Sequence, residues 1–96
     1  MSVESPTFTG ITPLNREDKL PEGNGYDLMF FITKYKHEHG VPPTVKKITE
    51  TKGYSSTSTT AWYLDRLIKD GWVIKTAFSA KTLSVNPAKV ILHFEI

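Results

Sequence analysis

The stretch between residues 41 and 71 constrains the fold more than any other, because it holds start and stop signals for two consecutive helices. A pair of prolines forces an extended backbone before Thr44, whose hydroxyl can cap a helix that runs to about Lys52. Gly53 then supplies the left-handed residue that ends this helix. The pattern predicts a short helix that closes in a tight turn.

A second helix is expected directly after this turn. Ser55 or Ser56 can cap its start, and Gly71 stops it. Its inward positions recur at helical spacing: Thr60, Leu64, Leu67 and Ile68. Two helices joined by a short turn with glycine, the second opening with small hydroxyl residues, are typical of a helix-turn-helix.

A longer helix is predicted before this pair, over about residues 25–39. Its apolar positions form a wide stripe that indicates a buried core helix: Leu28, Phe31, Ile32 and Tyr35. Two antiparallel strands over 72–77 and 81–85 are expected to form a β-hairpin wing after the helix-turn-helix. The predicted fold class is therefore α+β: a winged helix-turn-helix with three helices, a β-hairpin wing and a C-terminal strand.

The two ends of the chain differ in what their sequences predict. Residues 1–23 contain three prolines and few paired apolar positions, so we expect a flexible or loosely docked arm before a DNA-binding domain over 24–96. Alternation over 90–96 predicts a last strand, which either extends the wing sheet or pairs with a second protomer.

Composition excludes several classes of function. The chain has no cysteine, so disulfides and thiolate zinc sites are excluded. His37 and His39 do not share a helix face, which argues against a metal site, and no paired carboxylates or Ser/His/Asp set suggest an enzyme or a cofactor. No apolar run is long enough to span a membrane, so we expect a cytoplasmic protein.

Charge is distributed unevenly along the chain. Residues 1–30 carry two basic and five acidic side chains, whereas residues 31–86 carry nine basic and four acidic ones. The helix-turn-helix region is thus the basic part, as attraction to phosphate requires. A lysine-rich surface that serves only solubility would give nearly the same charge pattern.

The outward stripe of the second helix of the pair is the predicted reading surface. Its first half is small and hydroxylated, with Ser58 and Thr59, so the helix axis could descend into the major groove of double-stranded DNA. Trp62 lies one turn further on, where its ring could contact a thymine methyl or a sugar. Alternatively, the indole folds back onto Tyr63 or the wing as part of the core.

Two lysines in the first turn of the short helix are locally unfavourable. Lys46 and Lys47 lie where the helix dipole prefers acidic residues, and one explanation is that DNA phosphate supplies the missing negative charge. The alternative is an exposed pair of small energetic cost.

Phe78, near the wing tip, is either an apolar wedge or packs on its own hairpin. The predicted contacts to the DNA backbone are Thr44, Lys46, Lys47, Lys52, Ser55, Arg66, Lys69, Lys75 and Lys81.

Residues 26–86 resemble the N-terminal DNA-binding domain of the LexA repressors. That family follows a long first helix with Gly-x-Pro-Pro-Thr, a short helix, a glycine turn, a recognition helix with Leu-x-x-Leu, and Gly-x-Ile. The residues that match in register are Gly40, Pro42, Pro43, Thr44, Ile48, Gly53, Tyr54, Ser56, Leu64, Leu67, Gly71 and Ile74. The resemblance implies base contacts from the positions of Ser56, Ser58, Thr59 and Trp62.

The chain also departs from the family pattern. Lys47 replaces the usual glutamate of the second helix, and residues 21–25 lack the Leu-Thr start of the first helix. Its reading residues differ from those of the known repressor, so a different operator is expected. No self-cleavage domain accompanies the resemblance, so we expect no autoproteolysis and no dimerisation through such a domain.

Two functions remain open from the sequence. The first is a sequence-specific DNA-binding transcriptional regulator, of a small phage or mobile-element type, that acts as a homodimer or by cooperative assembly on DNA. The second is a winged-helix protein-interaction module, such as a replication accessory factor or an anti-repressor, which uses Trp62 and Phe78 as an interface. Salt-insensitive association without preference for any duplex would favour the second.

Overall fold

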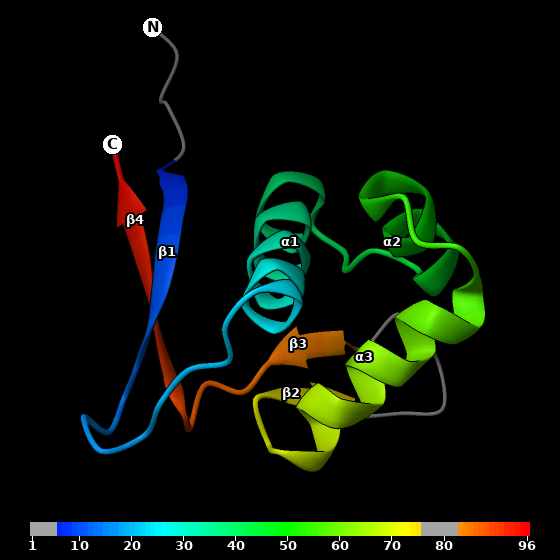
Figure 1. Cartoon of the computed structure of the whole chain (residues 1–96). Coiled ribbons are helices and arrows are strands. Elements are labelled where there is room, and N and C mark those ends of the chain that lie inside the picture. Colours follow the sequence, from blue (N-terminus) through cyan, green and yellow to red (C-terminus); the bar gives the residue numbers. More distant parts are fainter. Residues whose placement is uncertain (1–5, 76–82) are drawn as a thin grey trace, which may run out of the picture.

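The computed structural model of the chain describes residues 6–75 and 83–96 (Figure 1). Three helices and four strands follow one another along the chain: β1 (Thr7–Pro13), α1 (Asn24–His39), α2 (Val45–Lys52), α3 (Thr57–Lys69), β2 (Val73–Lys75), β3 (Leu83–Val85) and β4 (Val90–Glu95). This order confirms the α+β winged helix-turn-helix. The wing tip lies outside the described residues, and with it the predicted roles of Phe78 and Lys81.

The boundaries of α2 and α3 follow from the capping signals in the sequence. The Thr44 hydroxyl accepts a hydrogen bond from the Lys47 backbone N–H at 3.0 Å, and the Ser56 hydroxyl accepts one from Thr59 N–H at 3.3 Å. Gly53 ends α2 with a φ of 70°, a left-handed conformation that costs glycine little. Of the two serines that could cap α3, Ser56 is therefore the one that does.

The two helices of the helix-turn-helix are joined by a buried polar contact as well as by apolar packing. Ile48 from α2 and Thr60 from α3 are both fully buried. The Thr60 hydroxyl lies 2.5 Å from the hydroxyl of Thr49, which itself donates to the Val45 carbonyl. Because this chain of hydrogen bonds satisfies the hydroxyls below the surface, a threonine is tolerated where α3 contacts α2.

The wing is a two-stranded antiparallel sheet, in which Val73 faces Val85 and Lys75 faces Leu83. Asn86 closes its base, since its side-chain amide donates to the Gly71 carbonyl at 2.9 Å and its backbone N–H donates to the Trp72 carbonyl at 2.8 Å. The wing is thereby tied to the end of α3, and its described strands are shorter than the sequence predicted.

The N-terminal segment differs most from expectation. Instead of a flexible or loosely docked arm, residues 7–13 form β1, which pairs antiparallel with β4 along its whole length. Phe8 and Ile11 are buried in the main core, and the Phe8 ring lies 4.8 Å from that of Phe30 on α1. The sequence hid this role, because the strand has only two buried side chains and its partner lies at the other end of the chain.

The last strand is confirmed, but one of the two partners predicted for it, the wing sheet, is wrong. β4 forms a sheet with β1, separate from the sheet of the wing, so it does not extend the wing. The resulting β1–β4 ribbon lies on one side of α1, while α2 and α3 lie on the other (Figure 1). The helix α1 therefore separates the helix-turn-helix from the ribbon.

An ion pair links α1 to the helix-turn-helix. The Lys52 ammonium lies 2.7 Å from a carboxylate oxygen of Asp27 and 5.1 Å from the centre of the Phe31 ring. The Lys52 side chain is only 20% exposed, so its charge is engaged inside the fold. In the part of the chain that the structure describes, no helix is long and apolar enough to cross a membrane.

Replacing Phe8 by alanine tests whether β1 belongs to the core. We expect Phe8→Ala to lower the free energy of unfolding by about 3–5 kcal/mol, because the change leaves a cavity between α1 and the ribbon. Urea unfolding followed by circular dichroism measures this loss. Thr7→Ala, at an exposed position of the same strand, is the control and should change stability by less than about 0.5 kcal/mol. Equal stability of both variants would contradict a structural role for β1.

A double-mutant cycle tests the role of Lys52. We expect Lys52→Met and Asp27→Asn to couple by about 0.5–1 kcal/mol, since the two charges are close but Asp27 remains half exposed. Thermal or urea unfolding of the four proteins gives the coupling free energy. Lys46→Met, at an exposed position of the same helix, should show no coupling with Asp27→Asn.

Candidate nucleic-acid interface

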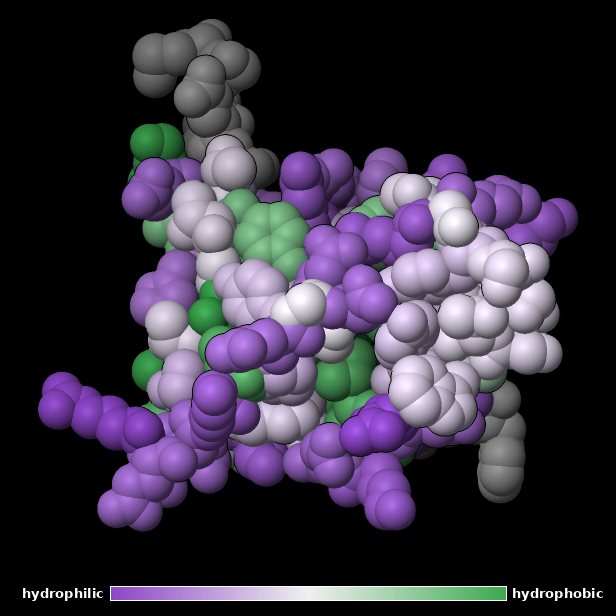
Figure 2. Space-filling model, viewed as in Figure 1, coloured by the Kyte–Doolittle hydropathy of each residue, from purple (hydrophilic) through white to green (hydrophobic). Residues whose placement is uncertain are grey.

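The outward face of α3 is open to solvent along its length. Ser58, Trp62 and Arg66 follow one another at successive helical turns, and all three are exposed. The Trp62 side chain is 55% exposed, and the Arg66 guanidinium lies 5.2 Å from the centre of its ring. Figure 2 shows a pale region, neither strongly hydrophilic nor hydrophobic, over the first part of α3 and the turn before it, and more strongly coloured atoms over the rest of the helix. Such a surface carries hydroxyls, an aromatic ring and one cation in a row.

The predicted base-reading residues are brought together, but their hydroxyls are not equally available. The hydroxyl of Thr59 lies 3.2 Å from that of Ser55 and 3.3 Å from that of Ser56, and its side chain is half-buried. Ser56 is the cap of α3 and accepts a backbone hydrogen bond. Only Ser58 and Trp62 of the four therefore project from α3 without a local structural task among the described residues.

Trp62 combines the two interpretations that the sequence left open. Its ring meets the ring of Tyr63 edge-on, with centroids 5.1 Å apart, yet more than half of the side chain remains exposed. Tyr63 is in turn fixed from α1, because the Asn24 amide donates to its hydroxyl at 3.0 Å. The indole is thus supported on one edge and available on the rest of its surface.

Tyr54 supports this arrangement from the turn between α2 and α3. Its ring lies 5.2 Å from that of Tyr63, and its hydroxyl is buried without a hydrogen-bond partner among the described residues. Burial, and then the nearby Asp27 carboxylate and Tyr63, raise the pKa of Tyr54 above its ordinary value of 10.0. Tyr54 therefore stays neutral and acts as a packing residue behind the reading surface.

The predicted backbone contacts separate into two groups. Most are exposed around the helix-turn-helix: Thr44, Lys46, Lys47, Ser55, Arg66, Lys69 and Lys75. Among the described residues, Lys46 and Lys47 form no ion pair, so both ammonium groups stand uncompensated at the start of α2. Lys52 is the exception, because its pairing with Asp27 takes it out of the set available to phosphate.

Sequence reasoning omitted one exposed hydroxyl of this surface. Thr57 is the first residue of α3 and is exposed beside Ser58. Its helical position adjoins the buried stripe through Thr60, so periodicity alone does not mark it as exposed. The first turn of a helix has no preceding turn to cover it, and this rule could have identified Thr57 from the sequence.

The chain is similar to LexA repressors of several lactic acid bacteria. It is 41% identical over 61 residues to the LexA repressor of Limosilactobacillus fermentum, 35% identical over 69 residues to that of Limosilactobacillus reuteri, and 36% identical over 70 residues to that of Lactiplantibacillus plantarum. These matches cover 64%, 72% and 73% of this chain but only 29%, 33% and 33% of the repressors. No protein-family model matches the chain.

The length of the matches and the observed architecture both support a relationship to the LexA repressors. About two thirds to three quarters of the chain aligns with these repressors, and the three helices and the paired wing strands have the arrangement expected for their shared region. The chain spans about a third of the length of the curated relatives that it matches. This chain is a LexA-like winged helix-turn-helix, related to the LexA repressors over the region that it shares with them.

Proposed function

We propose that this chain is a sequence-specific, double-stranded DNA-binding transcriptional regulator. The observation that carries the proposal is the open outer face of α3, where Ser58, Trp62 and Arg66 project in one row. The relatives at 35–41% identity are repressors by name, and this supports the same class of function. The absence of catalysis is part of the proposal: the hydroxyls at the start of α3 contact one another and a backbone N–H, as capping groups do.

Base reading falls to the first two turns of α3. The small side chains of Thr57 and Ser58 let the helix approach the floor of the major groove, where hydroxyls bond to base edges. Trp62 presents its ring edge to thymine methyl groups or to the sugar at the groove wall. Thr59 and Ser56 stabilise the start of the helix. Their hydroxyl oxygens can still accept hydrogen bonds from base edges, through the lone pairs that the bond between them does not use.

Phosphate contacts fix the position of α3 in the groove. Lys46 and Lys47 place two uncompensated ammonium groups beside the backbone N–H groups at the start of α2, where an anion is favoured. Arg66 and Lys69 extend the cationic surface along α3, and Lys75 extends it onto the wing. A protein with several such contacts loses affinity steeply as salt rises.

A protein-interaction module is the second candidate, favoured by one observation. Trp62 is a large aromatic side chain that is 55% exposed next to an arginine, and both residue types are enriched in protein interfaces. An interface of this kind would bind a protein with little dependence on salt. Homodimerisation or cooperative assembly on DNA belongs to the first candidate, since two half-sites give more specificity than one.

Selection from a random pool of duplexes tests sequence reading. We expect the chain to enrich a defined motif, and Ser58→Ala and Trp62→Ala to weaken binding to that motif by roughly 5- to 150-fold each, as the loss of about 1–3 kcal/mol of base contact implies. Fluorescence anisotropy at a stated salt concentration measures the affinities. Thr7→Ala on the β1–β4 ribbon should leave them unchanged. Enrichment of no motif would refute the reading role.

Charge reversal at the start of α2 should change the stability of the chain and its affinity for DNA in opposite directions. The double variant Lys46→Glu/Lys47→Glu should stabilise the unbound chain by about 0.5–2 kcal/mol, because acidic residues suit the helix N-terminus. The same variant should bind DNA more weakly and lower the slope of log affinity against log salt by about two. Urea unfolding and salt titration measure the two effects.

The matched control makes the same charge change elsewhere. Arg16→Glu/Lys19→Glu alters two exposed residues of the segment between β1 and α1. Its effect on the salt slope should be much smaller than that of the α2 variant. If the two double variants weaken binding equally, net charge and not phosphate contact at α2 accounts for the affinity.

A further inference from the structure

The strand β4 has an edge that no described residue pairs with, since its sheet contains only β1 and β4. The carbonyl groups of Lys89 and His93 accept hydrogen bonds from the β1 side, from Leu14 N–H at 2.9 Å and from the Thr9 hydroxyl at 3.2 Å. Alternate residues of a strand direct their backbone groups to opposite edges. The N–H and C=O groups of Leu92 and Phe94 therefore point to the open edge.

The two outer edges of the ribbon are built differently. β1 ends in Pro13 and contains an irregularity between Phe8 and Gly10, and both features discourage pairing with another strand. β4, with the sequence VILHFE, has no proline and keeps a regular register against β1 from Val90 to His93. An exposed edge with apolar and β-branched residues recruits a further strand unless something covers it.

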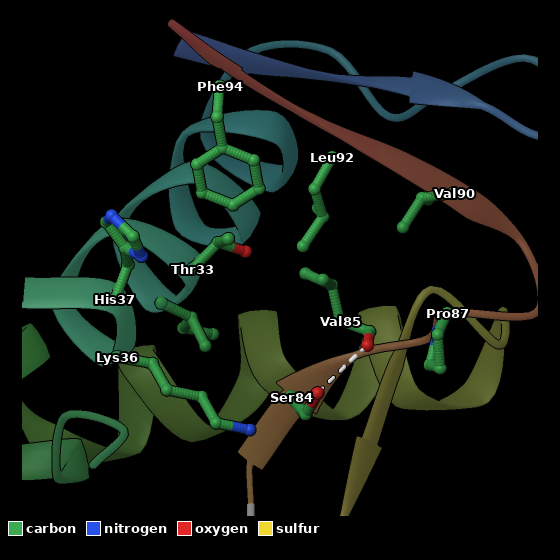
Figure 3. A pocket seen from close by; sticks show the side chains of 10 residues that line it. Thr33, Lys36, His37, Ser84, Val85, Pro87, Val90, Leu92 and Phe94 are labelled. Carbon is green, nitrogen blue, oxygen red and sulfur yellow. Dashed lines mark hydrogen bonds between the residues drawn. The ribbon is translucent and has the colours of Figure 1, made fainter. Parts of the chain in front are cut away.

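The apolar side chains of β4 are only partly covered by the rest of the chain. Val90, Leu92 and Phe94 point into a cavity of about 290 Å³ between β4, α1 and β3 (Figure 3). Phe94 is anchored there, with its ring centre 5.0 Å from that of His37, yet it remains about two-fifths exposed. The next residue of the same face, Ile96, is 99% exposed. The apolar face of the ribbon thus continues beyond what α1 covers.

We propose that β4 pairs antiparallel with β4 of a second copy of this chain, about a two-fold axis at Phe94. The four strands would then follow the order β1, β4, partner β4, partner β1. In this register Leu92 lies opposite Ile96 of the partner subunit, and both side chains face the cavity. His93 lies opposite Glu95 of the partner subunit on the outer face. Its Nε2 lies 2.7 Å from the Thr12 hydroxyl of β1, so Nδ1 is the ring nitrogen left to donate to the carboxylate. The edge is complementary to itself in polarity.

The contacts of neighbouring residues select this register over its alternatives. An axis at Leu92 would require the Val90 N–H, which already donates to the Asn86 carbonyl at 3.2 Å. It would also place Lys89 opposite Glu95 of the partner subunit, whereas the Lys89 ammonium already lies 4.4 Å from the centre of the Trp72 ring and donates to the Asp70 carbonyl. An axis at His93 would oppose the apolar Ile91 to the charged Glu95 and would again pair the buried Val90. Of these three registers, the one with its axis at Phe94 alone pairs exposed residues throughout, over 92–96.

The proposed interface leaves the α3 surface open. The ribbon and the helix-turn-helix lie on opposite sides of α1 (Figure 1), so pairing through β4 covers neither Ser58 nor Trp62. The inference goes beyond the proposed DNA binding and does not depend on it, because the pairing needs no nucleic acid.

Charge exchange across the interface is the decisive experiment. Sedimentation equilibrium of the whole chain without DNA should show a monomer–dimer equilibrium. Glu95→Lys and His93→Glu should each raise its dissociation constant roughly tenfold. The first change places an ammonium group opposite the imidazole of the partner, and the second places two carboxylates opposite each other. Each of these contacts occurs twice per dimer. The double variant His93→Glu/Glu95→Lys should restore the dimer, because a carboxylate at the first position then faces an ammonium group at the second position of the partner. Rescue of this kind identifies both the strand and its register.

An apolar variant with a matched control completes the test. Ile96→Lys should weaken the dimer at least roughly tenfold, whereas Leu14→Lys, at an exposed position at the opposite end of the ribbon, should leave it unchanged. Circular dichroism should show the same thermal unfolding for both variants. A wild-type chain that stays monomeric at millimolar concentration overturns the proposal, as does a dimer that responds to none of these changes. Loss of DNA binding would leave the result unaffected.

Discussion

The burial of one helix on two opposite sides holds this structure together. Leu28, Met29 and Ile32 of α1 are fully excluded from solvent, and every other element packs around this stripe directly or through a neighbour. Apolar burial of this kind is the dominant favourable term in folding. Because α1 is covered on one side by the helix-turn-helix and on the other by the β1–β4 ribbon, the two surfaces face away from each other (Figure 1). One side carries the surface that we propose binds DNA, and on the other side β4 has an edge that no described residue pairs with.

Local hydrogen bonds fix the start of α3, and the ion pair between Lys52 and Asp27 removes one cation from those available to phosphate. The Ser55, Ser56 and Thr59 hydroxyls hold the first turn of α3, and Thr49 and Thr60 fix α3 against α2 from below. Lys52 is withdrawn by Asp27, so the cations available to phosphate lie at the start of α2, along α3 and on the wing. This division follows from burial: a half-buried ammonium needs a partner inside the fold, whereas an exposed one does not.

Much of the helix-turn-helix could be predicted from the sequence, because its signals are local. The caps at Thr44 and Ser56 and the glycine at 53 act within one turn of the chain, and they predicted the boundaries of α2 and α3 within a residue or two. The exposure of Ser58 and Trp62 likewise followed from helical periodicity alone. The engagement of the Thr59 hydroxyl did not, because it depends on the turn that brings both Ser55 and Ser56 close to it.

The sequence by itself determined the three helices, the glycine turn and the outward row on α3, since each depends on residues a few positions apart. Tertiary structure decided what residues far apart do together. Phe8 meets Phe94 across the whole length of the chain, and Asp27 meets Lys52 across two helices. The residues of neither strand reveal which segment it pairs with, because a strand gains its stability from a neighbour and not from itself. The sequence could therefore show that β4 is a strand, whereas only the folded chain shows which of its edges is open.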